Sequence, residues 1–462
     1  MAMSRGVRWA LALVLMSLAA AAPASAKLSV RWMRSYAAPG TPARYDKVGV
    51  IKVGPARARN VLVLEPGTSA GAAYFVPLAR WIVARAPGWQ VWAVERRENL
   101  LEDQSQLNAA KAGRIDATQL FDYYLGWLSD KAITTHFQFI PNSRVQFAKQ
   151  WGMNVAVQDL HTVIGAARAL GGKVVLGGHS LGGSVVTAYA TWDFDSRPGA
   201  DGLAGLVYID GGSFGSESRA AATEALHGLR AASASPWLAF GGITAPLAGL
   251  LNATGSEAAL IDPDGPSSGQ SSGLLTPFGL TPSVPVTNLG QYGYALNVGT
   301  SPPGLIAAQA HLGAGIATTG SPPYGWNSTG ALTPITRFAA MFAGQGITGA
   351  DGTEWYFPDR LTLDTAAVDN GIPDAAQKVL GVHAVFGRRL PHSLRIYAFG
   401  AALSGPHRVL MKATQALARQ SGIPARNLTL VNEPGYAHND PAGAYPHNLF
   451  FNHLIPFLKT IA

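Results

Sequence analysis

The stretch that most constrains this chain is residues 173–184, which read KVVLGGHSLGGS. A short apolar run predicts a buried strand, a longer apolar run predicts a helix, and Ser180 lies between them with Gly178 and Gly182 on either side. A strand, a tight turn of this form and a helix make up the G-x-S-x-G nucleophile elbow. The serine of an elbow has strained dihedral angles, so its neighbours must be nearly free of side chains. With 53 glycines the pattern alone could arise by chance, but the strand and helix supply the context that the motif demands.

The N-terminus has the pattern of a targeting segment. Arg5 and Arg8 precede an apolar run over residues 9–22, and small residues follow up to Ala26. We interpret residues 1–26 as a signal peptide cleaved after Ala26, which predicts a secreted or periplasmic protein. The alternative is an uncleaved membrane anchor, for which the apolar run is too short to span a bilayer comfortably.

Composition narrows the class of protein. The chain has 462 residues, enough for two or three average domains or for one large α/β domain with insertions, and 48% of them are hydrophobic. Removing Arg5 and Arg8 from the 35 Lys and Arg leaves 33 against 27 Asp and Glu, a net charge of +6 without long basic runs, so we expect no nucleic-acid partner. The absence of cysteine excludes disulfides, thiolate metal sites and cysteine nucleophiles. No motif indicates a cofactor or a metal.

Strands and helices alternate through most of the chain, which predicts an α/β fold with a mostly parallel sheet and helices on both faces. Residues 45–53 and 60–65 are expected to pair as a hairpin, and residues 97–150 are expected to form a helical insertion. The expected strands are 29–36, 45–53, 60–65, 90–95, 174–176, 203–209, 393–399 and 428–431, and the expected helices are 73–85, 154–170, 409–421 and 449–460.

The alternation is lost between residues 213 and 391. No Lys or Arg occurs between Arg230 and Arg337, yet large apolar residues such as Trp237 and Trp326 recur, which favours a folded cap over a disordered linker. Its apolar, nearly uncharged composition suits an apolar substrate or a transient contact with a lipid interface, although ordinary core packing explains it nearly as well. The predicted organisation is therefore a core over 27–212, a cap or lid over 213–391 and the rest of the core over 392–462.

Three segments together resemble the α/β-hydrolase superfamily, in its lipase and esterase branch. They are GHSLGG at 178–183, LEPGTSAG at 64–71 and GYAH at 435–438, within a resemblance that covers roughly residues 48–212 and 393–462. The resemblance implies an α/β-hydrolase sheet with a large cap inserted between strands six and seven. It also implies an exported serine hydrolase that cleaves carboxylic esters through a Ser-His-Asp triad and a covalent intermediate on Ser180.

The general base is expected to be a histidine after the last strand, because the family's chain order is nucleophile, acid, histidine. His438 lies about seven residues past that strand, in a glycine-containing turn before the closing helix. His447 is a rival that suits a surface position better. His179 flanks the nucleophile, and its side chain should point away from Ser180.

The acid is less directly indicated. The loop that most often carries it in the family corresponds to residues 400–408, which contain no Asp or Glu. Some lipases use the preceding strand instead, and there Asp210 follows a buried strand on the same side of the sheet as the elbow. We therefore favour Asp210, with Glu433 and Asp440 as rivals because both lie near His438 in the sequence.

The oxyanion hole requires two backbone donors, which we assign to the N–H groups of Leu181 and Thr68, with Ser69 as a substitute for Thr68. The expected partner is a small, apolar ester; the oligomeric state is not indicated. The same triad would serve a peptidase or an envelope acyltransferase, and a hydrolase fold kept as a non-catalytic binding module is a further alternative.

Overall fold

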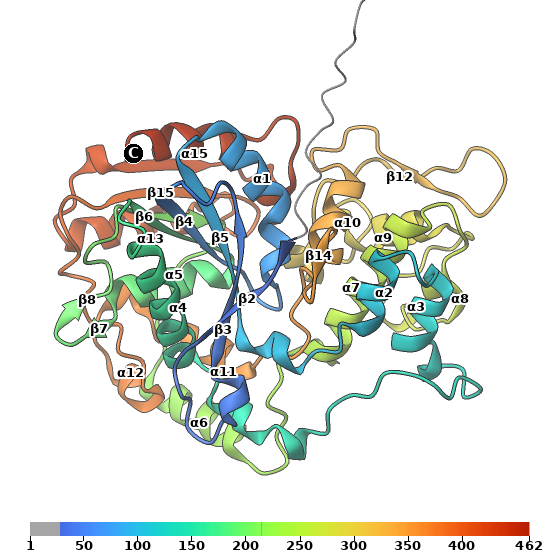
Figure 1. Ribbon diagram of the computed structural model, residues 1–462, viewed down its shortest axis with the longest axis horizontal. Coiled ribbons are helices and arrows are strands. Elements are labelled where there is room, and N and C mark those ends of the chain that lie inside the picture. Colours follow the sequence, from blue (N-terminus) through green and yellow to red (C-terminus); the bar gives the residue numbers. More distant parts are fainter. Residues whose placement is uncertain (1–27, 214, 462) are drawn as a thin grey trace, which may run out of the picture.

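Eight strands form the central sheet, in the order β16-β15-β9-β6-β4-β5-β3-β2 (Figure 1). The computed structural model describes residues 28–213 and 215–461; the predicted signal peptide lies outside the described residues. The sheet strands are β2 (Arg31–Arg34), β3 (Lys47–Val53), β4 (Asn60–Glu65), β5 (Trp89–Glu95), β6 (Val174–His179), β9 (Gly205–Ile209), β15 (Arg395–Gly400) and β16 (Leu428–Asn432).

The sheet is mostly parallel, as predicted. Neighbouring strands are parallel throughout the part of the sheet ordered β5-β4-β6-β9-β15-β16. Only β3 is antiparallel to its neighbours β5 and β2. This strand order and these directions are those expected for an α/β-hydrolase sheet, so the predicted fold class is confirmed. The expected hairpin between 45–53 and 60–65 is wrong, because β5 lies between β3 and β4. Every residue of β5 is buried, as expected for a strand inside the sheet with β3 on one side and β4 on the other.

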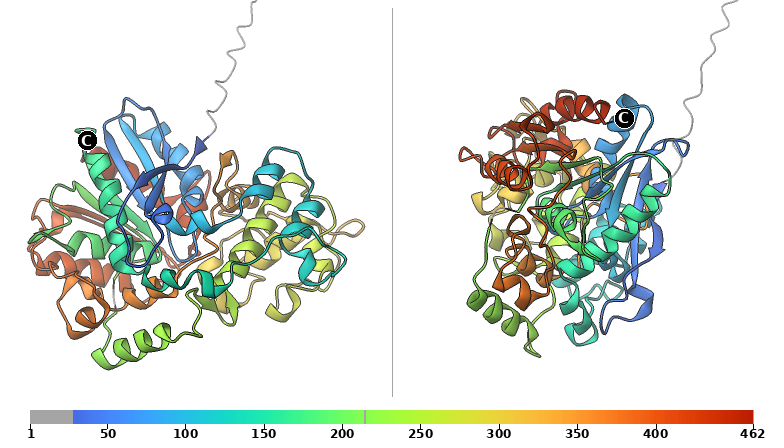
Figure 2. Two further views of the ribbon diagram at one scale, coloured as in Figure 1. Left: turned by 60° about the horizontal axis from the view of Figure 1, so that its bottom comes forward. Right: turned by 90° about the vertical axis from the view of Figure 1, so that its left-hand side faces the viewer.

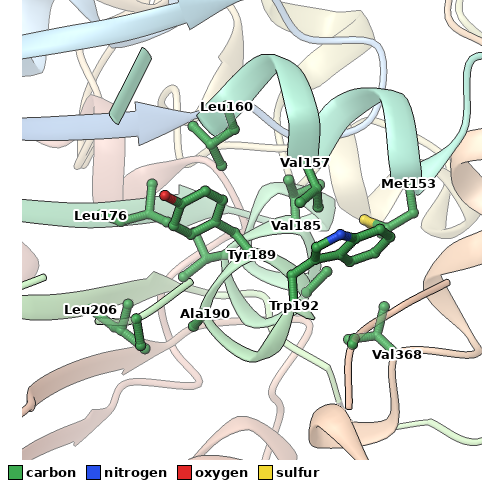
Figure 3. Close-up of a cluster of buried hydrophobic side chains, with 14 of the residues drawn as sticks. Met153, Val157, Leu160, Leu176, Val185, Tyr189, Ala190, Trp192, Leu206 and Val368 are labelled. Atoms are coloured by element: carbon green, nitrogen blue, oxygen red, sulfur yellow. The ribbon is translucent and has the colours of Figure 1, made fainter. Parts of the chain in front are cut away.

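Helices cover both faces of the sheet, and the strands supply each face alternately. In β4, Val61 and Val63 pack into the core beneath one helical layer, whereas Leu62 and Leu64 pack into the core on the opposite face. Figure 3 shows the first of these cores, where Tyr189 and other residues of α4 and α5 meet side chains from β6 and β9. The helices of this layer are α4 (Met153–Arg168), α5 (Leu181–Thr191) and α13 (Val409–Gln420); those of the other are α1 (Val76–Arg85), α10 (Ile335–Ala343) and α15 (Leu449–Lys459).

Apart from α10, which belongs to the layer of α1 and α15, the helices between β9 and β15 lie in two places. Helices α6, α11 and α12 pack into the core of α4 and α5, whereas α7, α8 and α9 lie beside α2 and α3 (Figures 1 and 2). Aromatic side chains from the predicted 97–150 insertion, among them Phe121 and Tyr124, share a third core with Trp237 and Trp355. The insertion and part of the predicted cap are therefore packed together, while the boundaries of the cap stay a prediction.

The remaining helices and the two-residue strands complete the fold. The helices are α2 (Ser105–Lys111), α3 (Ala117–Tyr124), α6 (Arg219–Arg230), α7 (Ala245–Ile261), α8 (Ser268–Ser271), α9 (Asn288–Leu296), α11 (Asp359–Thr365), α12 (Ala375–Leu380) and α14 (Asp440–Gly443). The strands pair as β1 (Leu28–Ser29) with β14 (Ile347–Thr348), β7 (Asp193–Phe194) with β8 (Arg197–Pro198), β10 (Ala239–Phe240) with β11 (Ile243–Thr244), and β12 (Gly315–Ile316) with β13 (Trp326–Asn327). In residues 28–461, no helix combines the length and apolar character needed to cross a membrane.

Candidate active site

The predicted site residues follow the carboxyl ends of neighbouring parallel strands. Ser180 comes directly after β6, Asp210 directly after β9, the loop with Thr68 after β4, and His438 six residues after β16. Because parallel strands present their carboxyl ends at one edge of a sheet, these residues gather at the same edge. This is the edge at which open α/β sheets bind their ligands.

Ser180 has the backbone of an elbow. Its φ is 57° and its ψ is −128°, in the region that residues with a side chain rarely occupy, and its N–H donates to the carbonyl of Ile209 at 3.0 Å. A Cβ on Gly178 would lie 2.2 Å from the carbonyl oxygen of Gly182, and a Cβ on Gly182 would lie 2.3 Å from that of Glu65. The two glycines are therefore required by close backbone contacts, which is the physical reason for the motif.

His438 and Asp210 are joined directly. His438 Nδ1 lies 2.8 Å from Asp210 Oδ2, and both side chains are fully buried. Asp210 itself has a positive φ of 43°, and its N–H donates to the carbonyl of Phe399 at 2.7 Å. The position of Asp210 directly after β9 and this backbone hydrogen bond therefore fix its carboxylate next to the imidazole of His438.

The loop that lacks an acidic residue supplies the partners of Asp210 instead. The N–H groups of Ala401 and Ser404 donate to Oδ1 at 2.7 and 3.0 Å, and that of Leu403 donates to Oδ2 at 3.0 Å. Burial alone would raise the pKa of Asp210, but the hydrogen bond and charge of His438 and these N–H groups lower it to about 2. The carboxylate is therefore ionised at neutral pH, and His438 Nδ1 must carry the hydrogen that joins them.

The rival acids and the rival base lie elsewhere. Asp440 accepts from His311 Nδ1 at 2.5 Å, from Thr333 Oγ1 at 2.8 Å and from the N–H of Ala437 at 2.8 Å. The bond that His438 Nδ1 makes is to Asp210, not to Glu433. His447 is exposed. Of the candidates weighed from the sequence, the pair in contact is thus His438 and Asp210.

His179 connects the elbow with the histidine loop. Its Nε2 lies 2.9 Å from the carbonyl oxygen of His438, its ring lies 4.3 Å from that of His438, and it stacks on Tyr74 with ring centroids 5.2 Å apart. Burial, together with the proximity of His438, lowers the pKa of His179 to about 3. With this low pKa, His179 is neutral at pH 7. Because a carbonyl oxygen only accepts, the single ring hydrogen is on Nε2. His179, which precedes Ser180, is thus in contact with His438. Within the described residues, no hydrogen bond joins Ser180 Oγ to His438 itself.

The loop after β4 passes close to Ser180. A Cβ on Gly67 would lie 2.8 Å from Ser180 Cβ and 3.5 Å from Ser180 Oγ, so only glycine fits. Ser69 in the same loop has a φ of 53°. Within the described part of the chain, the N–H groups of Thr68 and Leu181 have no hydrogen-bond partner. Both are therefore free to bind a ligand.

Arg96 holds this loop from its other side, a role that the sequence did not indicate. Two salt bridges hold its guanidinium: Arg96 pairs with Glu65 at 2.8 Å and with Glu354 at 2.7 Å. The guanidinium also donates to the carbonyl oxygens of Pro66, Gly67 and Ala70, at 3.0, 2.8 and 3.0 Å. A largely apolar strand followed directly by two consecutive arginines is the one signal that could have suggested a buried guanidinium.

No protein-family model and no curated protein matches the sequence. Solved structures are similar to it, among them a putative lipase from Sulfolobus solfataricus, with a TM-score of 0.44 and 13% identity over 94% of each chain. A carboxyl esterase from Bacillus coagulans has a TM-score of 0.39 and 12% identity over 94% of this chain and 98% of its own. A proline iminopeptidase from Mycobacterium smegmatis has a TM-score of 0.33 and 14% identity over 90% of this chain and 95% of its own.

Proposed function

We propose that this chain is an exported serine hydrolase that cleaves small, apolar carboxylic esters, with Ser180, His438 and Asp210 as its catalytic triad. The observation that carries the proposal is the 2.8 Å contact between His438 Nδ1 and Asp210 Oδ2, formed next to a serine in the strained conformation of an elbow. A serine hydroxyl is a weak nucleophile until an oriented base takes its proton, and an ionised acid is what orients such a base.

The catalytic steps follow from the tautomer of His438. Because Nδ1 carries the hydrogen shared with Asp210, Nε2 has the free lone pair that accepts the proton of Ser180. Ser180 Oγ forms a bond to the ester carbonyl carbon, and the C=O electron pair moves to the oxygen. Collapse of this tetrahedral intermediate breaks the bond to the alcohol, which leaves with the proton from His438. Water then attacks the acyl-enzyme, again giving its proton to His438, and the acid departs as Ser180 regains its hydrogen.

The oxyanion of each tetrahedral intermediate requires donors that are in place before it forms. We assign this role to the N–H groups of Leu181 and Thr68. Leu181 is the first residue of α5, where backbone N–H groups have no intrahelical partner and the helix dipole favours negative charge. Gly67 brings the other loop against Ser180, which supports Thr68 as the second donor.

The preference for an apolar substrate is supported by two exposed apolar side chains on segments that bond to Asp210 or to the residue after His438. Leu403 is 38% exposed on the loop that binds Asp210. Ile306 is 39% exposed and precedes Ala307, whose carbonyl accepts from Asn439 beside His438. These side chains are available to an acyl chain or to a lipid interface. Export rests on the pattern of residues 1–26, and an N-terminus at Lys27 in the extracellular or periplasmic fraction would test it.

Covalent labelling tests the proposal. A fluorophosphonate should label the wild-type protein at Ser180 and should fail to label Ser180→Ala, with circular dichroism confirming that the variant is folded. A folded wild type that resists labelling would refute the proposal. Nitrophenyl esters of increasing chain length would then define the acyl preference, and cleavage of aminoacyl anilides with no cleavage of esters would indicate a peptidase.

A further inference from the structure

We infer that Arg96 is a positioning residue that orients the oxyanion-binding N–H of Thr68, an inference that rests on the proposed function. Arg96 directly follows β5 and is 4% exposed, so it cannot touch a substrate directly. Its guanidinium nonetheless donates to three carbonyl oxygens of one short loop, those of Pro66, Gly67 and Ala70. Such a concentration of bonds fixes the orientation of the loop's peptide groups.

The geometry of the peptide bond converts these contacts into a direction for the donor. In a trans peptide the C=O and the following N–H point in opposite directions. The Gly67 carbonyl points at Arg96 Nη2, at 2.8 Å, so the N–H of Thr68 points away from Arg96. The Pro66 carbonyl points at Nη1, at 3.0 Å, so the N–H of Gly67 does the same. Ser180 contacts this loop at Gly67, which leaves these N–H groups available to an oxyanion formed on Ser180.

Glu354 holds both Arg96 and the far side of the same loop. Its Oε2 accepts from Arg96 Nε at 2.7 Å, its N–H donates to the carbonyl of Ser69 at 3.0 Å, and its carbonyl accepts from Ser69 Oγ at 2.7 Å. Glu65 is the second carboxylate on the guanidinium. Arg96 is therefore anchored by two buried carboxylates, and the loop cannot rotate its peptide groups without breaking several charge-assisted bonds.

Lysine cannot reproduce this arrangement. Its ammonium is a single donor point, whereas the planar guanidinium donates to two carboxylates and three carbonyls at once. In Arg96→Lys the buried charge is kept and the peptide groups are released. The expected result is a loss of transition-state stabilisation without a loss of substrate binding.

The test compares an ester with its thionoester, whose developing C–S⁻ is a poor acceptor for N–H donors. We expect Arg96→Lys to lower kcat on the oxoester by about 10- to 100-fold, somewhat less than the loss of an oxyanion donor outright, with KM unchanged. The kcat on the thionoester should fall far less. The ratio of the oxoester rate to the thionoester rate should therefore be lower in Arg96→Lys than in the wild type. Arg97→Lys is the matched control: Arg97 is equally buried and pairs with Asp159 and Asp46, but makes no bond to the loop, so the ratio should stay at the wild-type value.

The outcomes separate the inference from the function on which it rests. A wild type that cleaves no ester refutes both. An active wild type whose rate ratio is unchanged in Arg96→Lys, or falls equally in Arg97→Lys, refutes the inference alone. If Arg96→Lys does not fold, the wild-type adduct with a phosphonate decides: the phosphonyl oxygen should lie within about 3 Å of Thr68 N, with Arg96 still bonded to Gly67. A phosphonyl oxygen held by other donors overturns the inference.

Discussion

Glu257→Gln should change how the stability of the fold depends on pH. Glu257 is in α7, is 0% exposed, and has no hydrogen-bond partner for either carboxylate oxygen within the described part of the chain. Burial raises its pKa from 4.5 to about 7; Asp351 adds to the rise, and Lys111 opposes it. The folded protein therefore retains a proton on Glu257 that the unfolded chain has released.

The sign and the size of the effect follow from linkage. Because the folded state binds more protons than the unfolded state, Glu257 lowers the free energy of unfolding as pH rises from 4.5 toward about 7. A pKa difference of this size corresponds to about 3 kcal/mol. Glutamine resembles the protonated acid and does not ionise, so the variant should avoid this loss.

Urea unfolding of both proteins at about pH 4 and about pH 8 measures the effect. At each pH the wild-type free energy of unfolding is subtracted from that of Glu257→Gln. This difference should be larger at the higher pH than at the lower pH by about 3 kcal/mol. Glu224→Gln, the same change on the exposed surface of α6, is the control and should leave the pH dependence unaltered. If the Glu257→Gln difference is the same at both pH values, the reasoning is refuted, because Glu257 would then ionise alike in both states.

Two further substitutions test the proposed site, and a third tests the stability of α4. Asp210→Asn should reduce turnover on the order of 10³- to 10⁴-fold, with slow labelling of Ser180 retained, because asparagine no longer selects the Nδ1–H tautomer of His438; an unchanged rate would exclude Asp210 as the acid. Gly67→Ala should lower kcat at least ~10-fold, since its Cβ would lie 2.8 Å from Ser180 Cβ; steady-state kinetics measures this. Gly165→Ala in α4 has open space and should raise the free energy of unfolding by about 0.5–1 kcal/mol with activity unchanged, as checked by urea titration.

The parts of the fold that sequence reasoning predicted correctly are those in which the backbone restricts side chains. Gly178 and Gly182 are obligatory because a Cβ on either would lie within 2.3 Å of a backbone carbonyl oxygen, so the elbow is visible as a pattern. The core strands are visible because their alternating side chains enter two different cores. Asp210 could be placed because it directly follows such a strand.

Contacts between distant backbone segments could not be predicted in the same way. The N–H groups of Ala401, Leu403 and Ser404 hold Asp210, but nothing in their side chains indicates this. Arg96 and Glu354 are 258 positions apart, and a salt bridge over that separation has no local signature. The expected hairpin failed for a related reason, since short spacing between two strands does not exclude a third strand from the place between them.

The three N–H groups that hold Asp210 also determine how the 401–404 loop can vary. Backbone donors survive almost any change of side chain, so the acid's ionisation does not depend on which residues stand at these positions. Proline is the exception, because it has no N–H to give. Leu403 is also 38% exposed, so libraries that omit proline could diversify the side chains of this loop while the carboxylate of Asp210 keeps its charge.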